Sequence, residues 1–300
     1  MLNLKLLYRQ KILLGLAEAF IEPLPRIDFM KLLFLLCKEE KQDFYSFFPF
    51  KYGCFSFQVY QDWQYLKSKK LMCESDFFQK NEAYAGILNE LRPADKVMIS
   101  HFREKYACLR GDALIHKTYV SYPEYTRKSE IKDKILTPAE RKSVEKALQS
   151  NSSLMDNCIF TIGYESISID EYLRRLIHYG INLVCDVRAK PKSMKYDFND
   201  KRLANFLHQT DIAYHGMPSL GIPSELRHDL HSKDSYKRLF DLYEKQILQE
   251  RNQEIMTIAQ WIHSGRRTAL TCFEKNPEQC HRLRIAAKLS ADFGFHTVNI

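Results

Sequence analysis

Short apolar segments alternate with helical segments over the second half of the chain. The apolar segments lie at residues 158–162, 182–187, 212–215, 268–273 and 295–300. Between them, apolar residues recur at helical spacing at 168–179, 201–209, 235–248, 252–263 and 278–290. Strands that are joined through helices pair in parallel, and the helices cover the faces of the sheet. We therefore expect an α/β domain with an open, mainly parallel sheet and helices on both faces.

The first half of the chain has a different hydrophobic pattern, in which apolar residues recur mostly at helical spacing. Helices are expected at 4–16, 30–37 and 57–68, with two or three more within 81–116 and another starting at Thr137-Pro138. Asp28 is placed to cap the second of these helices. The aromatic run at 44–52 ends in a turn and predicts a short hairpin. These patterns predict a mainly helical domain.

A linker is expected between the two halves. Residues 149–153 read Gln-Ser-Asn-Ser-Ser, a composition that is typical of loops. A chain of 300 residues is also longer than most single cores. We therefore expect two domains, at 1–150 and 155–300.

Composition narrows the class of protein. No run of residues approaches the roughly 18 apolar residues of a membrane span, and the N-terminus lacks the pattern of a signal peptide. A cytoplasmic protein with no membrane partner is expected. The eight cysteines are spread along the chain without a C-x-x-C pair, so most are expected to be small buried hydrophobes.

The charge is unevenly distributed between the two halves. Residues 1–150 carry 25 Lys and Arg against 19 Asp and Glu, and residues 151–300 carry 20 against 18, giving the formal net charge of +8. A basic first half is compatible with a nucleic-acid partner. An ordinary solvated surface explains it equally well.

Polar residues gather where the expected strands end. These residues are Gly163, Tyr164 and Glu165, then Asp186 and Arg188, then Tyr214, and finally Cys272 and Glu274. In an open α/β sheet, ligands bind beyond the carboxyl ends of the strands. Because residues two apart in a strand share a face, Asp186 should lie beside Arg188, and Cys272 beside Glu274. The sequence therefore predicts a polar pocket at this edge of the sheet.

The segment from Cys272 to Arg282 holds an unusual density of reactive groups. Between the end of a strand and the start of a helix it contains two thiols, at Cys272 and Cys280, as well as Glu274, His281 and Arg282. The free N–H groups at a helix start, together with a nearby guanidinium, suit a phosphate or a carboxylate.

Several of these residues also have structural interpretations. Asp186 and Arg188 could form an ion pair that braces a loop, and Glu165 could cap the helix that starts near Ser168. Tyr164 and Tyr214 could be packing residues. The sequence leaves these alternatives open.

The same residues resemble a known family. Gly163-Tyr164-Glu165, Asp186-Val-Arg188, Leu220-Gly221 and Cys272-Phe-Glu274 … Pro277-Glu-Gln-Cys280-His281-Arg282 are similar to the signature of the family catalogued as domain of unknown function 488, over residues 158–289. Residues 31–72 are similar to the helical, winged-helix-like N-terminal modules of antitoxin-type regulators. The first resemblance implies a fold and a site without a reaction. The second suggests binding of nucleic acid or protein, and a role in bacterial defence or repair.

The first functional hypothesis is an enzyme that acts on a nucleotide or a nucleic acid by hydrolysis or cleavage of a glycosyl bond. Glu165, Asp186 or Glu274 would be the base or nucleophile, and His281 would carry a proton. Arg188 and Arg282 would clamp an anion. Further candidate residues are Cys272 in catalysis and Gly163, Tyr164, Tyr214 and Cys280 in ligand binding.

Two alternatives remain open at the level of sequence. The first is rhodanese-like chemistry at Cys280, whose thiol pKa would be lowered by the helix start and by His281 and Arg282. The second is a regulator that binds nucleic acid and senses a small anion without turnover. No cofactor or metal is expected, because Cys272, Cys280 and His281 offer only three ligands and an adjacent Cys-His pair is awkward geometry.

Overall fold

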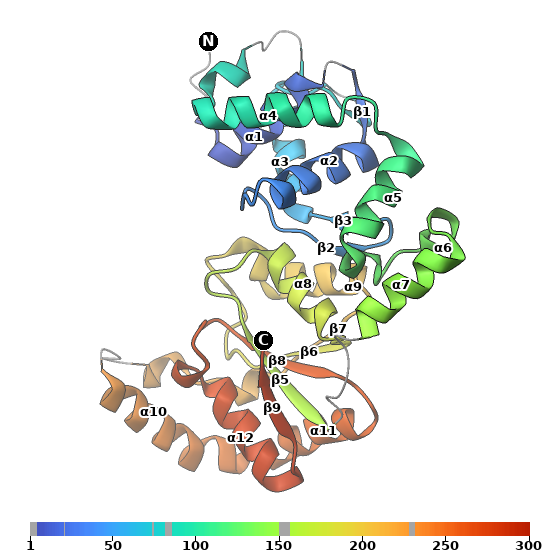
Figure 1. The fold of residues 1–300 in the computed structure, drawn as a ribbon. Coiled ribbons are helices and arrows are strands. Elements are labelled where there is room, and N and C mark those ends of the chain that lie inside the picture. The colour runs from blue at the N-terminus through green and yellow to red at the C-terminus, as the bar shows by residue number, and fades with distance from the viewer. Residues whose placement is uncertain (1–4, 21, 74, 82–85, 150–156, 228–231) are drawn as a thin grey trace. The chain divides into compact units, whose positions relative to one another are not determined.

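The chain folds into two compact units, Met1–Asn151 and Ser152–Ile300 (Figure 1). The structure is a computed structural model that describes residues 5–20, 22–73, 75–81, 86–149, 157–227 and 232–300. The linker predicted at 149–153 lies, apart from its first residue, outside the described residues. Among the described helices, none has the length and apolar character needed to cross a membrane.

The first unit is mainly helical, as predicted. Its helices are α1 (Tyr8–Ala19), α2 (Arg26–Glu39), α3 (Phe57–Ser68), α4 (Pro93–Lys105), α5 (Gly111–Ser121), α6 (Lys132–Ile135) and α7 (Pro138–Gln149). The predicted hairpin is present as β2 (Phe48–Phe50) and β3 (Gly53–Phe55), which pair antiparallel. A second short pair joins β1 (Leu24–Pro25) to β4 (Phe77–Phe78). The similarity to winged-helix modules stays a prediction.

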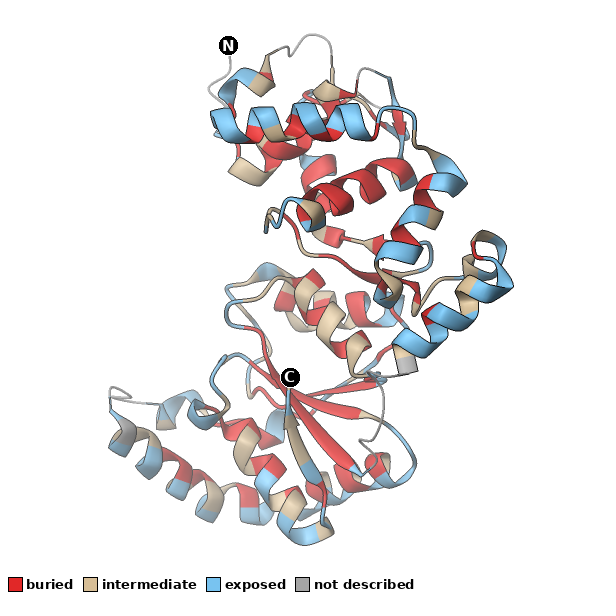
Figure 2. Ribbon diagram, viewed as in Figure 1, coloured by how far each residue is buried: buried red, intermediate tan, exposed pale blue. Residues whose placement is uncertain are grey.

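Helix α2 is the centre of the first unit. The five residues from Leu32 to Leu36 are fully buried, so the helix is surrounded on all sides (Figure 2). Lys31 is also buried within it, and its amine donates a hydrogen bond to the carbonyl oxygen of Cys54 at 3.0 Å. Burial lowers the pKa of Lys31. The hairpin that contains Cys54 is thereby tied to the core.

The role predicted for Asp28 is wrong. Helix α2 begins two residues earlier, at Arg26, so Asp28 lies inside its first turn and cannot cap it. Its buried carboxylate instead accepts a hydrogen bond of 3.0 Å from the backbone N–H of Gly111, the first residue of α5. Asp28 therefore satisfies a free N–H group of a different helix, a partner that helix periodicity does not reveal.

The second unit is an α/β domain with a five-stranded parallel sheet, as predicted. The strands are β5 (Cys158–Gly163), β6 (Leu183–Asp186), β7 (Ala213–Gly216), β8 (Thr268–Cys272) and β9 (His296–Asn299), in the order β7-β6-β8-β5-β9. The helices are α8 (Ile169–His178), α9 (Asp200–Gln209), α10 (Lys233–Gln246), α11 (Asn252–His263) and α12 (His281–Phe293).

Helices cover both faces of this sheet (Figure 1). Ile159, Cys185 and Leu270 belong to one apolar cluster with residues of α10, α11 and α12. The neighbouring Phe160 points to the other face, where its ring lies 6.0 Å from that of Tyr179 at the end of α8. Because every central strand is covered twice, its side chains are mostly apolar on both faces. The polar exceptions inside β5 and β8 are buried threonines, such as Thr161 and Thr268.

The strand register brings the polar ends together. In the β5–β8 pair Gly163 lies opposite Cys272, and in the β6–β8 pair Asp186 lies opposite Thr271. The last residues of these three strands therefore lie at the same edge of the sheet. This alignment creates the candidate site.

One carboxylate in the first unit should make the stability depend on pH. Glu18 accepts hydrogen bonds from the backbone N–H groups of Gly86 (2.9 Å) and Leu88 (3.0 Å) and from the amine of Lys80 (3.0 Å). Burial opposes ionisation, but these bonds outweigh it and lower the pKa of Glu18 below its usual value of 4.5. The folded state therefore binds this proton less readily than the unfolded state.

We expect Glu18→Gln to reduce the free energy of unfolding at pH 7 by about 1–3 kcal/mol, because three partly buried donors lose a charged acceptor. The difference between wild type and variant should shrink as pH falls from 4.5 through the lower pKa of the folded state. Urea unfolding at a series of pH values measures it. A difference that does not change with pH would contradict this role of Glu18.

Candidate functional site

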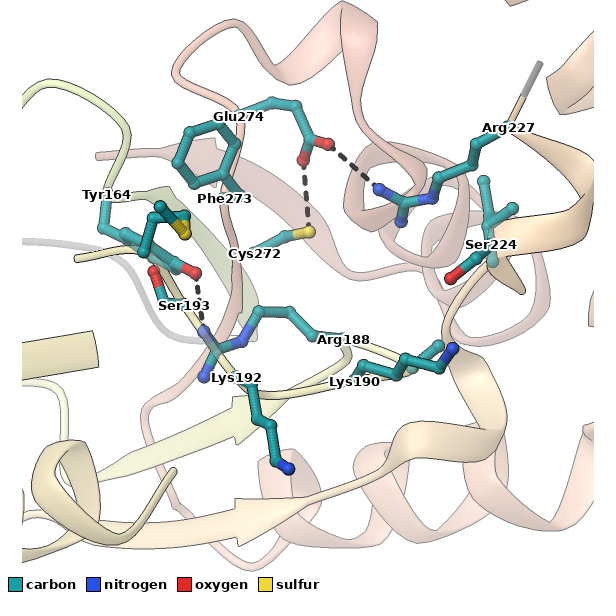
Figure 3. A pocket seen from close by; sticks show the side chains of 13 residues that line it. Tyr164, Arg188, Lys190, Lys192, Ser193, Ser224, Arg227, Cys272, Phe273 and Glu274 are labelled. Atoms are coloured by element: carbon teal, nitrogen blue, oxygen red, sulfur yellow. Dashed lines mark hydrogen bonds and ion pairs between the residues drawn. The ribbon is translucent and has the colours of Figure 1, made fainter. Parts of the chain in front are cut away.

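A cavity of about 340 Å³ opens at the carboxyl ends of the strands. Its walls come from the ends of β5, β6 and β8 and from the loops that follow β6 and β7 (Figure 3). Of the residues predicted from sequence, Tyr164, Arg188, Cys272 and Glu274 line it. The predicted pocket is therefore present among the described residues, with four of its predicted members.

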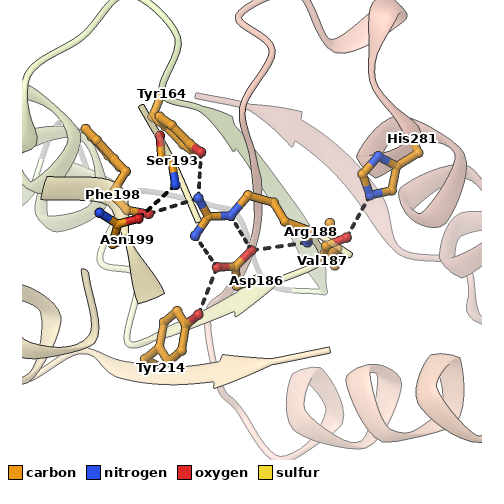
Figure 4. Close-up of polar contacts among 9 residues, drawn as sticks. All are labelled: Tyr164, Asp186, Val187, Arg188, Ser193, Phe198, Asn199, Tyr214 and His281. Atoms are coloured by element: carbon orange, nitrogen blue, oxygen red, sulfur yellow. Dashed lines mark hydrogen bonds and ion pairs between the residues drawn. The ribbon is translucent and has the colours of Figure 1, made fainter. Parts of the chain in front are cut away.

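Arg188 is anchored at the cavity wall by a network of hydrogen bonds (Figure 4). Its guanidinium donates to both carboxylate oxygens of Asp186, at 2.8 and 2.5 Å. It also donates to the hydroxyl of Tyr164 at 2.5 Å and to the carbonyl oxygen of Phe198 at 2.9 Å. Burial alone would disfavour the charge of Arg188, but Asp186 and Tyr164 raise its pKa above the usual value. The cation is fixed in charge and in position.

Asp186 is occupied by the same network. It is 1% exposed and also accepts a hydrogen bond of 2.8 Å from the hydroxyl of Tyr214. Burial and the Asp186 carboxylate raise the pKa of Tyr214, which therefore keeps its proton to donate. Neither Asp186 nor Tyr214 is among the residues that line the cavity. Asp186 and Arg188 thus form the ion pair named as the structural alternative, and the hydroxyl of Tyr214 is bonded to that pair.

Three further cations at the cavity were missed by the sequence analysis. Lys190, Lys192 and Arg227 all line it and are exposed. The two lysines flank Pro191 in the loop after β6, and Arg227 lies in the loop after β7. The Lys190-Pro191-Lys192 sequence in the loop after β6 could have indicated the two lysines from sequence. With Arg188, these residues give the cavity four cationic side chains.

Glu274 is the carboxylate that lines the cavity. Its Oε2 atom lies 3.1 Å from the thiol of Cys272, and its Oε1 atom lies 3.6 Å from Nη1 of Arg227. Burial opposes ionisation of Glu274, but hydrogen bonds from Cys280 and Cys272 and the charge of Arg227 lower its pKa below the usual value. The cavity therefore combines an anionic oxygen with a cationic rim.

Cys280 and His281 lie behind Cys272, away from the cavity wall. The side chains of Cys272, Cys280 and His281 are all buried, and their donor atoms lie within 4.8 Å of one another. Cys280 is the extended residue just before α12, and this conformation lets it and His281 reach one point despite being adjacent. The adjacency of Cys280 and His281 in the sequence therefore does not keep their donor atoms from lying close enough to share one metal ion.

The thiol pKa expected for Cys280 is also corrected. Burial raises the pKa of Cys280 well above its usual value, and the neighbouring Cys272 adds to this. The helix start was expected to lower it. Desolvation of the thiolate outweighs that effect because Cys280 is 1% exposed.

Arg282 and Gly163 hold the loop that carries Glu274. Arg282 is buried and donates to the carbonyl oxygens of Glu274 at 2.6 Å and Lys275 at 3.3 Å. A Cβ atom on Gly163 would lie 1.9 Å from that same Glu274 oxygen, so only glycine fits there. Neither residue is among those lining the cavity. Arg282 and Gly163 contact the protein itself, although both were predicted from sequence to contact a ligand.

Glu165 braces the same loop from outside. It is exposed, does not line the cavity, and accepts a hydrogen bond of 2.9 Å from the backbone N–H of Lys275. The N-cap of α8 is Ser168, whose hydroxyl accepts a hydrogen bond from the N–H of Glu171. Glu165 therefore neither caps α8 nor faces the cavity.

One comparison with known proteins matches part of the second unit. Residues 168–289 match the family model described as "Domain of unknown function DUF488". The C-terminal unit resembles DUF488. The match begins after β5, ten residues later than the sequence patterns suggested, and it includes the loops that supply most of the cavity. No curated protein and no solved structure matches the chain.

The loop after β8 offers a direct test of the role of Arg282. We expect Arg282→Ala to loosen the loop after β8, because two carbonyl oxygens lose their donor. Hydrogen exchange at the backbone amides of Tyr164 and Lys275 should accelerate by roughly ten- to hundredfold. These amides bond to Phe273 and Glu165, across the same loop. Arg284→Ala, two positions along α12, is the matched control and should leave both amides protected. Equal exchange in the two variants would contradict this role.

Proposed function

We propose that the C-terminal unit is a hydrolase that acts on a nucleotide or a nucleic acid. A phosphate-bearing group would bind among Lys190, Lys192 and Arg227. Glu274 would act as the general base that activates water to cleave an ester or glycosyl bond. One observation carries this proposal, namely a cavity of about 340 Å³ that joins four cationic side chains to a single ionised carboxylate.

The distribution of free donors supports an anionic ligand. Lys190, Lys192 and Arg227 are exposed at the rim, so their N–H groups are accessible from solvent. Arg188 is rigid, which reduces the cost of ordering a side chain on binding. Several donors that converge on one volume are the usual arrangement for phosphate recognition.

The aromatic wall of the cavity supports a nucleotide over a simple anion. Phe273 lines the cavity and is 41% exposed. Its ring lies 5.5 Å from that of Tyr164, in an edge-to-face arrangement. An exposed ring beside a cluster of cations can stack on a base while the cations bind its phosphate.

Rhodanese-like chemistry has less support. Cys280 does not line the cavity, and its pKa is raised. Cys272 does line the cavity, but it is buried and lies beside the carboxylate of Glu274. Its thiol is already engaged as a hydrogen-bond donor to that carboxylate, at 3.1 Å.

Two changes separate binding from turnover in this proposal. The double variant Lys190→Ala, Lys192→Ala should weaken binding of a fluorescent nucleotide by about tenfold, equivalent to 1.4 kcal/mol. Glu274→Gln keeps the shape of the side chain and should lower turnover by about 10²- to 10⁴-fold while the nucleotide still binds. Turnover would be followed as release of base or phosphate from nucleotides and oligonucleotides.

The matched control is Lys237→Ala, Lys245→Ala on α10, because these exposed lysines do not line the cavity. If the cavity variant bound as tightly as this control, the phosphate site would be wrong. Binding by wild type without turnover of any substrate would reject the hydrolase and favour the regulator.

The first unit would hold a nucleic acid in this proposal. Its support is the balance of 25 basic against 19 acidic residues over 1–150, with Lys69 and Lys70 exposed at the end of α3. Affinity for an oligonucleotide should fall steeply between 50 and 200 mM salt, by roughly 10³-fold if about six phosphates are contacted. Fluorescence anisotropy measures this. Binding that is absent or insensitive to salt would exclude the nucleic-acid role.

A further inference from the structure

Cys272, Cys280 and His281 form a buried cluster of three metal-binding groups. The Nδ1 atom of His281 lies 3.9 Å from the sulfur of Cys272 and 4.0 Å from that of Cys280. All three donor atoms lie within 4.8 Å of one another. We propose that these three side chains bind a zinc ion beside the cavity. This inference stands apart from the proposed reaction and does not depend on it.

The orientation of His281 is fixed in the way that a metal ligand requires. Its Nε2 atom lies 2.8 Å from the carbonyl oxygen of Val187 (Figure 4). A carbonyl oxygen can only accept, so Nε2 carries a proton, and in the neutral imidazole the Nδ1 atom, which lies nearest the two sulfurs, is then the one with the lone pair. Metal-binding histidines usually donate their second N–H to a carbonyl or a carboxylate in this manner.

The spacing of the donors is close to that of a tetrahedral site. With Zn–S bonds of about 2.3 Å and a Zn–N bond of about 2.0 Å, ligand atoms lie about 3.5–3.8 Å apart at tetrahedral angles. The two N···S separations exceed this by a few tenths of an ångström. The two sulfurs lie within 4.8 Å of each other, so all three side chains would move inward to bind the ion.

A purely structural role explains the cluster less well. At separations of 3.9 and 4.0 Å, a thiol is a weak hydrogen-bond partner for the buried Nδ1 atom of His281. Both thiols donate to the carboxylate of Glu274, so the Nδ1 atom of His281 is the group left with weak partners only. A zinc ion satisfies all three, and both thiols release their protons to solvent when it binds.

The ligand set favours zinc over harder cations. Thiolates and imidazole are the ligands of tetrahedral zinc sites, whereas magnesium and calcium prefer oxygen ligands. The cluster joins the end of β8 to the start of α12, with Val187 supplying the orienting carbonyl. The ion would thus connect elements that already form one rigid edge of the sheet.

Through Cys272, the ion would lie next to the cavity. Cys272 and Glu274 line the cavity, whereas Cys280 and His281 lie behind them. The Oε2 atom of Glu274 is 3.1 Å from the sulfur of Cys272 (Figure 3). Three protein ligands with one open position are the pattern of catalytic zinc sites, and a carboxylate beside that position can hold the bound water. We therefore assign Glu274 as a neighbour of the ion and not as a required ligand.

Metal analysis of the full chain tests this inference. The chain would be purified with a phosphine reductant, dialysed against zinc and then against buffer, and is expected to retain about one zinc per chain. Cys280→Ser and His281→Ala should lose it. Glu274→Gln should keep it. Cys185→Ala, which removes a buried cysteine elsewhere in the same sheet, is the matched control and should also keep it.

Cobalt substitution of the wild-type protein gives an answer even if the ligand variants fail to fold. A thiolate-to-cobalt charge-transfer band together with intense visible bands of a tetrahedral ion would support the site. No retained zinc, a cobalt spectrum without the charge-transfer band, or equal zinc in folded Cys280→Ser and Cys185→Ala would each overturn it.

Discussion

The site of the second unit depends on one buried ion pair, between Asp186 and Arg188. The pair is formed at the end of β6, and both partners are almost fully buried. Removing one partner of such a pair costs about 3–5 kcal/mol, because the other charge is left without compensation in a dry environment. Tyr164, Tyr214 and the carbonyl of Phe198 satisfy the remaining groups. The pair therefore fixes a cation at the cavity and joins three strand ends and one loop around it.

A second constraint acts on the loop after β8. Gly163 permits close approach of this loop to β5, and Arg282 holds two of its carbonyl oxygens. The loop in turn places Glu274 at the cavity, beside Cys272 at the end of β8. Buried arginines thus have a structural role on both sides of the cavity, while exposed cations at its rim are available to a ligand. This division gives the cavity both rigidity and free positive charge.

The location of the site was predictable because strand ends of an open α/β sheet always meet at one edge. The alternation of apolar and helical segments indicated where each strand ends. The sequence also showed polar residues at those strand ends. Their roles were not predictable in the same way. Arg282 was expected to clamp an anion and instead holds backbone, and Arg227 was missed although it reaches the cavity. The sequence shows which polar side chains are present at the site, but it does not show which hydrogen-bond partners each of them has in the folded protein.

Hydrophobic periodicity along the chain was enough to predict its two-part organisation, the parallel sheet and the edge at which polar groups collect, because each segment expresses its periodicity independently. The folded structure settled which of those groups are already paired inside the protein and which remain free. It also decided that Cys272, Cys280 and His281 meet, through the extended backbone at Cys280 and the carbonyl of Val187. These contacts form between residues that are far apart in the sequence and come close together only after folding.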